Sequence, residues 1–334
     1  MAITDEQAQS RLSADLQAIL RCLNCGAGVE SDPAGGFLCP ACKRQYPNLQ
    51  GVARFVEAQD YAASFGFQWH RYARTQLDHD EVQESDSNFR VKTGLRPEEL
   101  EGKLVLDVGC GMGRFADVAT RWGARVVGID LSAAVEVAAR NLAGRDFVGL
   151  QADVFRLPFA PQSFDYIYSI GVLHHTPDCE RAVKTLPQYL KPGGSLAVWL
   201  YSGYNNWYRF SDLYRKVTTR LSPRTLHGFL RVIVPPINAL DSGVRRLPVV
   251  GRPLSGILRH VVPVNHNAQR SWRVLDTFDW YSPTYQSKHT YEQVFRWFED
   301  CGLEDLHVGG TPISVRGRRP LEPPIPTFGG NRRG

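Results

Sequence analysis

The chain has 334 residues, 43% hydrophobic and 22% charged, and these near-average values exclude collagen-like, coiled-coil and wholly disordered proteins. The length predicts one elaborated domain or two. A formal net charge of +5 is too small, averaged over the whole chain, to indicate a nucleic-acid-binding protein.

The first residues favour a cytoplasmic protein. Residues 1–20 mix acidic and basic side chains with apolar ones, unlike a secretory signal peptide. No uncharged apolar stretch reaches the roughly 18 residues that a membrane-spanning helix needs. In a reducing compartment, spaced cysteines are more often metal ligands than disulfides, which bears on the seven cysteines of this chain.

Two Cys-x-x-Cys pairs open the sequence, Cys22 with Cys25 and Cys39 with Cys42. Each pair can supply two thiolates from a tight turn, so together they predict a tetrahedral four-sulfur zinc site. Such a site has no open coordination position and is therefore structural. Four free thiols in a loop are the alternative. So short a segment has little core of its own, and bound metal would supply folding energy.

Residues 18–56, which include Tyr46 to Phe55 after the second pair, resemble the small zinc-binding domain of the activator subunit that partners tRNA and protein methyltransferases. That module is also found fused ahead of methyltransferase domains. The resemblance implies that a methyltransferase follows in this chain.

The central region alternates apolar runs with helical patterns. Residues 103–108 predict a buried strand that ends near Asp107, and Gly109, Gly111 and Gly113 then form a turn into a helix over 114–122. Such a turn lets a ligand approach the backbone and the start of the helix. A second strand ends at Asp130, placed to accept hydrogen bonds from ribose hydroxyls, and a helix follows it to Asn141.

Three more strands complete the pattern. The third strand, residues 147–150, leads to Asp153, which is placed near an adenine. The fourth, residues 163–170, ends before His174 and His175. The fifth, residues 195–200, follows a helix over 180–190 and a turn at 191–194. Strands that alternate with helices are typical of a parallel sheet with crossover connections. The sequence therefore predicts an α/β fold.

Residues 60–201 and 275–316 closely resemble the class I S-adenosylmethionine-dependent methyltransferases, a doubly wound, seven-stranded, mostly parallel Rossmann-like fold. The matching motifs are the loop 107–113, Gly128-Ile-Asp130, Ala152-Asp153, Phe164-Asp165 and Lys191-Pro-Gly-Gly194. A nicotinamide-dependent dehydrogenase is the rival, but its glycine spacing differs by one position. The resemblance implies S-adenosylmethionine as cofactor, held by the following residues: Asp107, Gly109, Gly111, Gly113, Asp130, Leu131, Asp153 and Val154.

His174 and His175 follow the fourth strand at the edge where ligands bind in such sheets. One of them is a candidate general base for a hydroxyl acceptor, since imidazole titrates near neutrality. In the alternative interpretation one histidine packs in the wall and the other contacts only the cofactor.

Two aromatic segments flank the core. Residues 61–76 predict a lid whose aromatic faces attract a sulfonium, or else a helix that simply packs on the sheet. Residues 276–290 suit either an acceptor pocket or a hydrophobic plug. The candidate substrate residues are Trp69, Tyr72, Tyr201, Asp279, Tyr281 and His289.

The C-terminal part predicts a capped helix from Thr290 to Cys301 and two strands, over 303–308 and 312–315. The tail from 317 to 334 is rich in Pro, Gly and Arg, and we expect it to be poorly ordered. The predicted divisions are a zinc module (1–56), a core with its lid (57–201), a basic helical insertion (202–275), the end of the core (276–316) and this tail.

The insertion carries most of the positive charge. Residues 202–270 hold eleven Lys and Arg against two acids, Asp212 and Asp241, with apolar residues interleaved throughout. This pattern indicates a surface that binds anionic lipid headgroups or a phosphate-bearing acceptor. The alternative is a helical cap whose charges are merely solvated. Prolines at 223, 235, 236, 248, 253 and 263 predict short pieces and no long continuous helix.

Three functions follow. The leading hypothesis is methyl transfer, most plausibly to oxygen, on a small-molecule or lipid- or phosphate-linked biosynthetic intermediate by a cytoplasmic enzyme that associates with membrane through residues 202–270. The second is an RNA methyltransferase, which the zinc module and the basic insertion suggest. Base-stacking aromatics are expected in that case, and the insertion is mostly aliphatic. The third, a non-catalytic cofactor-binding subunit, is disfavoured by the intact Asp107, Asp130 and glycine loop.

Overall fold

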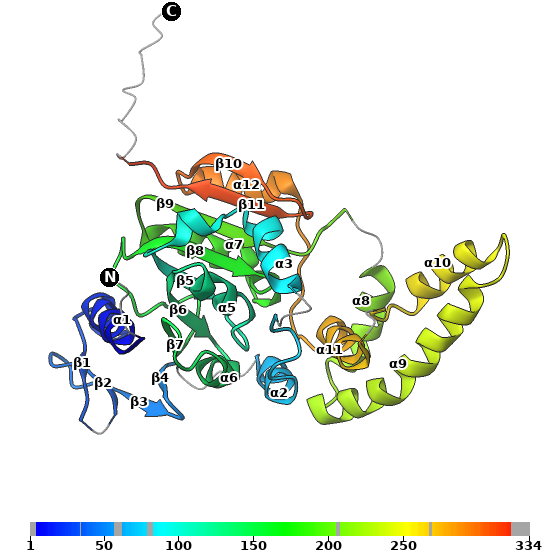
Figure 1. Cartoon of the computed structure of the whole chain (residues 1–334), viewed down its shortest axis with the longest axis horizontal. Coiled ribbons are helices and arrows are strands. Elements are labelled where there is room, and N and C mark those ends of the chain that lie inside the picture. Colours follow the sequence, from blue (N-terminus) through cyan, green and yellow to red (C-terminus); the bar gives the residue numbers. More distant parts are fainter. Residues whose placement is uncertain are drawn as a thin grey trace, which may run out of the picture.

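The computed structural model describes residues 5–33, 35–56, 62–78, 83–204, 208–266 and 269–321. One eleven-stranded sheet runs through these residues, with helices on both faces (Figure 1). The strands are β1 (Glu30–Ser31), β2 (Gly36–Leu38), β3 (Gln45–Leu49), β4 (Val52–Phe55), β5 (Leu104–Val108), β6 (Arg125–Asp130), β7 (Phe147–Ala152), β8 (Phe164–Ile170), β9 (Leu190–Trp199), β10 (Glu304–Val308) and β11 (Ser314–Arg318). Their order across the sheet is β1-β2-β3-β4-β7-β6-β5-β8-β9-β11-β10.

The seven strands from β7 to β10 form the doubly wound sheet. Strands β7, β6, β5, β8 and β9 run parallel to one another, and β11 and β10 close the edge in antiparallel pairing. The prediction of a mostly parallel seven-stranded sheet is confirmed. Ligands bind such sheets beyond the carboxyl ends of the strands, so the site is expected at the ends of β5, β6 and β8.

The N-terminal module continues this sheet. Its last strand, β4, pairs in parallel with β7, with Ala53 opposite Leu150, and β3, β2 and β1 extend the edge in antiparallel fashion. Helix α1 (Asp5–Ile19) places Leu12 and Leu16 in the same hydrophobic layer as β7. The cysteine-rich segment is therefore bonded into the edge of the large sheet.

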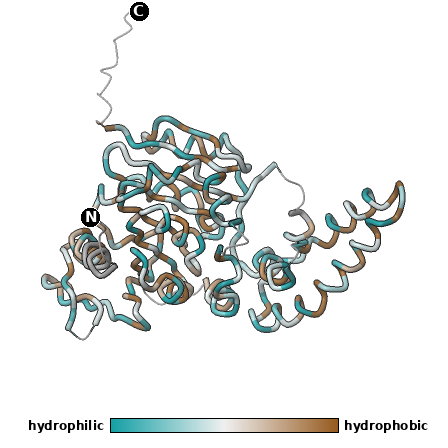
Figure 2. Tube along the Cα trace, viewed as in Figure 1, coloured by the Kyte–Doolittle hydropathy of each residue, from teal (hydrophilic) through white to brown (hydrophobic). Residues whose placement is uncertain are grey.

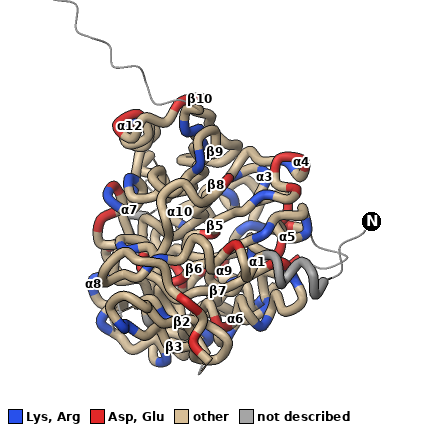
Figure 3. Tube along the Cα trace, turned by 90° about the vertical axis from the view of Figure 1, so that its left-hand side faces the viewer, with Lys and Arg blue, Asp and Glu red and all other residues tan. Residues whose placement is uncertain are grey.

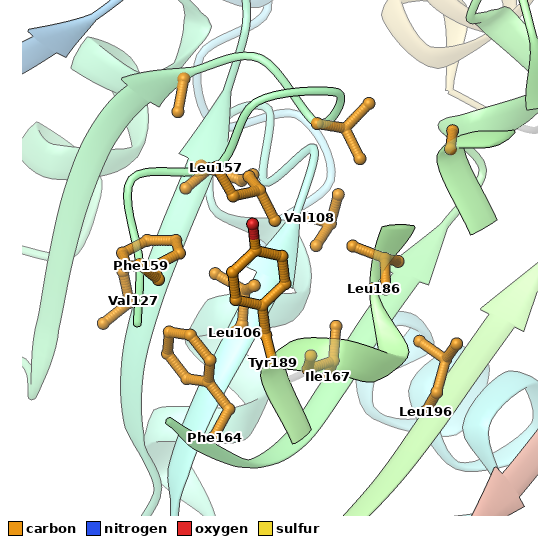
Figure 4. Close-up of a cluster of buried hydrophobic side chains, with 14 of the residues drawn as sticks. Leu106, Val108, Val127, Leu157, Phe159, Phe164, Ile167, Leu186, Tyr189 and Leu196 are labelled. Atoms are coloured by element: carbon orange, nitrogen blue, oxygen red, sulfur yellow. The ribbon is translucent and has the colours of Figure 1, made fainter. Parts of the chain in front are cut away.

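Hydrophobic layers cover both faces of the sheet. Strand β5 is buried at all five positions, which explains its unbroken apolar run. Figure 4 shows part of one layer, where the ring of Phe159 meets those of Phe164 and Tyr189 edge to face. That layer contains α1, α7 (Cys179–Thr185) and α12 (Tyr291–Asp300). The opposite layer contains α3 (Glu84–Thr93), α4 (Pro97–Leu100), α5 (Arg114–Arg121) and α6 (Ala134–Asn141).

Strand β9 begins earlier than predicted. The motif Lys191-Pro-Gly-Gly194 is predicted as a turn, but it lies inside β9, where the pairing with β8 shifts register between Phe164 and Tyr166. A side chain at Gly194 would come within 2.7 Å of the Asp165 carbonyl oxygen, so this irregular pairing needs a glycine. Short 3-10 turns stand at Leu173–His175 and Pro187–Tyr189, and the second follows α7, which ends sooner than predicted.

The insertion is a group of helices beside the sheet: α8 (Tyr208–Thr218), α9 (Pro223–Arg245), α10 (Gly251–Val261) and α11 (Arg270–Tyr281). Helices α9 and α11 share a small core with α2 (Ala63–Arg71), the predicted lid helix. Helices α9 and α10 form a hairpin that extends away from the sheet in Figure 1. The predicted boundary at 275/276 is wrong, because it falls inside α11.

The prediction that prolines break the insertion into short pieces is wrong at Pro235 and Pro236. Both lie within the 23-residue helix α9. A proline frees the carbonyl four residues before it, and the residues concerned, Arg231 and Val232, are exposed, so water can satisfy their carbonyls. The other four prolines stand at or near helix ends.

No helix of the described part of the chain is long and apolar enough to cross a bilayer. Basic and acidic residues alternate around the core elements in Figure 3 and form no single-sign face there. The expectation about the tail concerns residues 317–334, of which 322–334 lie outside the described residues.

Candidate active site and metal site

The glycine turn after β5 brings backbone to the carboxyl edge of the sheet. Gly109 and Gly111 have positive φ values of 80° and 53°. A Cβ at Gly109 would come within 2.3 Å of Val172, and one at Gly111 within 3.1 Å of the Trp69 indole nitrogen. Both positions therefore require glycine for conformation and for space. Gly113 also has a positive φ and precedes α5 directly.

A cavity of about 360 Å³ lies against this turn. Its walls come from the ends of β5, β6, β7, β8 and β9, together with α2, α3, α5 and α11. Nine of the predicted site residues line it: Trp69, Gly109, Gly111, Asp130, Leu131, Val154, His175, Tyr201 and Asp279. Residues far apart in the sequence thus meet at the predicted edge.

Asp130 lies in the wall at the end of β6. One carboxylate oxygen accepts from the Gly111 backbone N–H at 3.0 Å, and the other accepts from the Ser132 backbone and hydroxyl at 2.8 and 2.7 Å. Burial raises the pKa of this carboxyl, and these three donors oppose the rise. A carboxylate offers about four acceptor positions, so Asp130 retains capacity for a ligand.

Asp107 does not reach the cavity and is buried behind the glycine turn. Its carboxylate accepts a 3.0 Å hydrogen bond from the Tyr168 hydroxyl. Burial is the main cause that raises its pKa to about 8, and nearby Asp130 adds to it. Asp107 therefore supports the turn in this structure, and its expected contact with the cofactor stays a prediction.

At the end of β7, Ala152 and Val154 line the cavity but the carboxylate of Asp153 does not. Asp153 accepts from the Phe155 backbone N–H at 3.0 Å and stabilises its own turn. The lining residues at this end, Ala152 and Val154, are therefore apolar, and the expected contact of Asp153 with adenine stays a prediction.

The two histidines differ. The His175 ring lines the cavity; its Nδ1 lies 3.0 Å from the Tyr285 carbonyl oxygen, and its buried Nε2 has no hydrogen-bond partner. A carbonyl only accepts, so Nδ1 carries the proton and Nε2 presents a lone pair. Burial lowers the pKa of His175, which favours its neutral form, although nearby Asp279 and the Tyr285 carbonyl oppose this.

His174 has the packing position that the alternative interpretation gives to one of the two histidines. It is fully buried outside the cavity, and its ring stacks on that of Tyr201 at 3.8 Å. Burial holds its pKa well below the usual histidine range, so this ring is neutral.

Of the six predicted substrate residues, three line the cavity. Trp69 covers Gly111, and the Tyr201 hydroxyl donates to Asp279 at 3.2 Å.

The other three have structural contacts instead. Tyr72 bonds His227 of α9 at 2.8 Å, and the Tyr281 hydroxyl donates to the Pro263 carbonyl at 2.7 Å. His289 lies 2.7 Å from the Ser287 hydroxyl and packs on Trp297. These three belong to the framework around the cavity.

Sequence reasoning missed a charged wall. Lys92 of α3 places its ammonium 3.7 Å from the centroid of the Trp199 ring, and Arg114 of α5 and Asp276 of α11 lie in the same cavity. Burial and the positive charge of Arg114 lower the pKa of Lys92 to about 7. Burial, with nearby Asp279, raises the pKa of Asp276 to about 7. No sequence motif joins these three helices, although Asp276 is the first residue of the aromatic segment 276–290.

Comparisons with known proteins agree with this geometry. A family model described as the methyltransferase domain matches residues 106–198. The ubiquinone biosynthesis O-methyltransferase of Coxiella burnetii (strain Dugway 5J108-111) is 30% identical over 158 residues, which cover 46% of this chain and 68% of that protein. The protein of the same name from Nitrosococcus oceani is 36% identical over 140 residues, 41% of this chain and 59% of the relative.

This chain belongs to the S-adenosylmethionine-dependent methyltransferases. Among solved structures, a Haemonchus contortus phosphoethanolamine N-methyltransferase 2 aligns at 17% identity and a TM-score of 0.41, over 74% of this methyltransferase and 46% of that chain. The complex of the Haloferax volcanii Trm112 methyltransferase activator with a methyltransferase aligns at 20% identity and a TM-score of 0.38, over 46% of this chain and 66% of that chain.

Apart from the cavity, the methyltransferase has a cluster of four cysteine thiols in its N-terminal module. The Sγ atoms of Cys22, Cys25, Cys39 and Cys42 all lie within 4.8 Å of one another, with 3.5 Å between Cys22 and Cys42 and between Cys25 and Cys39. These separations are far too long for disulfide bonds of about 2.05 Å. They are close to the ~3.8 Å between sulfurs around a tetrahedral zinc with Zn–S bonds of about 2.3 Å.

Backbone turns hold the four thiols in place. The Gly26 N–H donates to the Cys22 carbonyl, and the Lys43 N–H donates to the Cys39 carbonyl, both at 2.9 Å. The Tyr46 hydroxyl lies 3.2 Å from Cys22 Sγ, and its ring stacks on Phe55 of β4 at 4.3 Å. The donor set and its spacing fit a zinc ion, and Tyr46 connects this cluster to the sheet.

Proposed function

We propose that this methyltransferase transfers a methyl group to a hydroxyl of a small biosynthetic intermediate, free or lipid-linked. The single observation that carries the proposal is His175, which lines the cavity and whose buried Nε2 atom has no hydrogen-bond partner. The relatives named ubiquinone biosynthesis O-methyltransferases support oxygen as the methylated atom.

S-adenosylmethionine, when bound, supplies an electrophilic methyl group on a sulfonium. In this proposal Gly109 and Gly111 admit its amino-acid end close to the backbone, and Asp130 accepts hydrogen bonds from its ribose. Leu131, Ala152 and Val154 provide the apolar wall for adenine. Each of these residues lines the same cavity.

His175 then acts as the general base. The acceptor hydroxyl gives its proton to Nε2 while Nδ1–H stays bonded to the Tyr285 carbonyl. A phenolic hydroxyl, with a pKa near 10, is acidic enough for this transfer to help. Tyr201 and Asp279 form a hydrogen-bonded pair beside the acceptor, and Trp69 excludes water from the glycine turn.

Labelled S-adenosylmethionine with catechol and alkyl catechols as probes tests this function. We expect His175→Ala to lower kcat by about 10²-fold or more, with S-adenosylhomocysteine affinity unchanged. The matched control is His70→Ala, because His70 is exposed on α2 outside the cavity. Turnover of His175→Ala within threefold of the control would exclude His175 as the base.

The pH dependence of turnover is a second readout. Because burial lowers the pKa of His175, its neutral form is available at neutral pH. Lys92 and Asp276 of the same cavity have pKa values of about 7, so they can change kcat/KM near that pH. We expect the part of the acid-side fall that is absent in His175→Ala to occur only below the usual histidine range. If that part occurred at or above pH 7, it would contradict the prediction.

We further propose that four thiolates of the N-terminal module hold a structural zinc ion. Metal analysis of the purified protein checks this, with one zinc per chain expected and none in a Cys25→Ser, Cys42→Ser variant. The partner role that the activator-like module suggests rests only on the sequence resemblance.

We also propose that the α9–α10 hairpin contacts an anionic membrane surface. Val249 at its turn is 96% exposed, and both helices mix apolar and polar residues along their length (Figure 2). The exposed apolar residues include Phe229, Val232, Leu240, Leu247, Val250, Leu254 and Ile257. Arg231, Arg245, Arg246 and Arg252 stand among them. Each such arginine contributes about 1 kcal/mol of attraction to an anionic surface.

The mostly aliphatic character of these exposed residues favours a lipid surface over RNA, which would use aromatic side chains to stack bases. We expect the full chain to sediment with phosphatidylglycerol vesicles and not with phosphatidylcholine vesicles. The binding should weaken as salt increases. Equal binding to both vesicle types would contradict the electrostatic part of the proposal.

A further inference from the structure

A buried arginine of the insertion reaches the methyltransferase core. Arg215 of α8 is 8% exposed, and its guanidinium donates to three neutral oxygens: the Pro283 carbonyl at 2.6 Å, the Gln286 side-chain oxygen at 3.0 Å and the Trp280 carbonyl at 3.3 Å. Burial lowers the pKa of this arginine. A buried cation is costly unless it is well hydrogen-bonded, so these contacts hold both partners firmly.

All three acceptors belong to residues 280–286, which run from the last turn of α11 toward His289. The same helix adds a fourth bond, from the Thr218 hydroxyl to the Tyr281 carbonyl at 2.9 Å. Helix α8 therefore satisfies the carbonyls of three residues within four positions. The path of this segment is fixed from the insertion side.

On its other side the segment meets the histidine pair. The Tyr285 carbonyl accepts from His175 Nδ1 at 3.0 Å, and the Ser287 backbone N–H donates to the His174 carbonyl at 2.8 Å. Tyr285 lies between Pro283 and Gln286, the two closest acceptors of Arg215. The carbonyl that selects the tautomer of His175 is thus held between two contacts of one guanidinium.

We propose that Arg215 is a positioning residue for His175. By fixing residues 280–286 it keeps the Tyr285 carbonyl against Nδ1, so that the proton stays on Nδ1 and Nε2 keeps its lone pair. The proposal rests on the proposed function for its effect on turnover, but the effect on the tautomer does not. The insertion then completes the active site in addition to covering it.

The test uses the full chain with histidine ¹⁵N-labelled, and His175 signals assigned by their loss in His175→Gln. In wild type we expect nitrogen shifts of a neutral Nδ1–H ring. In Arg215→Met we expect these shifts to move toward the Nε2–H form, and kcat with an alkyl catechol to fall at least tenfold. Affinity for S-adenosylhomocysteine should stay within about threefold, because no cofactor contact is changed.

Two further variants keep the test decisive if Arg215→Met folds poorly. Arg215→Lys retains the positive charge but loses the several N–H donors of the guanidinium. Thr218→Val removes only the hydrogen bond to the Tyr281 carbonyl. Both variants should shift the His175 tautomer less than Arg215→Met does. The control is Arg220→Met, which removes an exposed arginine from the end of the same helix region. An unchanged Nδ1–H signature in all Arg215 variants would overturn the proposal.

A failure of the proposed function looks different. If His175→Ala keeps its turnover while Arg215→Met still changes the His175 tautomer, the positioning contact stands and the catalytic role of His175 does not.

Discussion

The methyltransferase core carries two additions that are attached in opposite ways. The N-terminal module donates four strands to the sheet, and Phe55 of β4 is 1% exposed within the main core. In the described part of the chain the insertion adds no strand to the sheet beyond an isolated bridge between Ser202 and His289, and its buried residues form a separate small core that it shares with α2. An addition that shares a sheet must fold with it, whereas a helical hairpin that stands off can change without disturbing the core.

The largest expected effect is loss of the zinc ion proposed for the N-terminal module. Structural zinc contributes on the order of 10 kcal/mol to small modules, and this module is paired with β7 along β4. We therefore expect Cys39→Ser, or a chelator, to lower the Tm of the whole protein by roughly 10 °C or more.

Scanning calorimetry and S-adenosylhomocysteine binding, followed together, measure this effect. The matched control is Cys301→Ser, a half-buried thiol near α7 and outside the cluster. A core that melts at an unchanged temperature after the metal is lost would show that the module is only appended.

A matched pair of phenylalanines sharpens the comparison. Phe55 is fully buried against Tyr46 in β4, and Phe229 on α9 is 52% exposed. We expect Phe55→Ala to lower the free energy of unfolding by about 3–5 kcal/mol, because it removes a large side chain from a packed core. Phe229→Ala should change it by no more than about 0.5 kcal/mol. Urea denaturation measures both, and similar losses would mean that the hairpin is part of the cooperative core.

Acid should weaken the hairpin at one defined contact. Asp241 of α9 accepts from the Arg259 guanidinium and the Ser255 hydroxyl of α10, and these bonds, Arg259 first, lower its pKa to about 2. A lowered pKa means that the contact stabilises fully above the unfolded value of 3.8 and is lost as the pH falls toward 2. The contribution is about 2 kcal/mol.

The check compares wild type with Asp241→Asn by urea denaturation at several pH values. Their difference in unfolding free energy should be largest above pH 5 and should shrink to near zero at pH 2. A difference independent of pH would assign the loss to packing instead of charge.

The glycine turn and the alternation of strands with helices could be predicted because each depends on residues close in sequence. A buried strand, a glycine-rich turn and a helix leave a local pattern, as 103–122 do. Lys92, Arg114 and Asp276 could not be predicted, since three helices distant in sequence bring them together only after folding. The same limit applies to Asp107 and Asp153: the sequence places each near the end of a strand, but the direction of each side chain depends on neighbours such as Tyr168.

The prediction that Pro235 and Pro236 break the helix was wrong for a related reason. The sequence shows the missing N–H groups, but it does not show whether the freed carbonyls face water or the core. At Arg231 and Val232 they lie on exposed residues, so the helix continues.

The smallest effect on stability is expected for exposed apolar residues of the α9–α10 hairpin. Substitutions there should change membrane binding without changing the stability of the fold. Val249 and Ile257 are both exposed, so Val249→Ser with Ile257→Ser should change the unfolding free energy by no more than about 0.5 kcal/mol. The same substitutions remove apolar area that a membrane would bury, and we expect binding to phosphatidylglycerol vesicles to fall severalfold. Leu49→Ser is the control, because Leu49 is an exposed leucine of the N-terminal module. A variant that binds vesicles as well as this control would remove the hairpin from the contact, and the charge of the insertion alone would then have to explain binding.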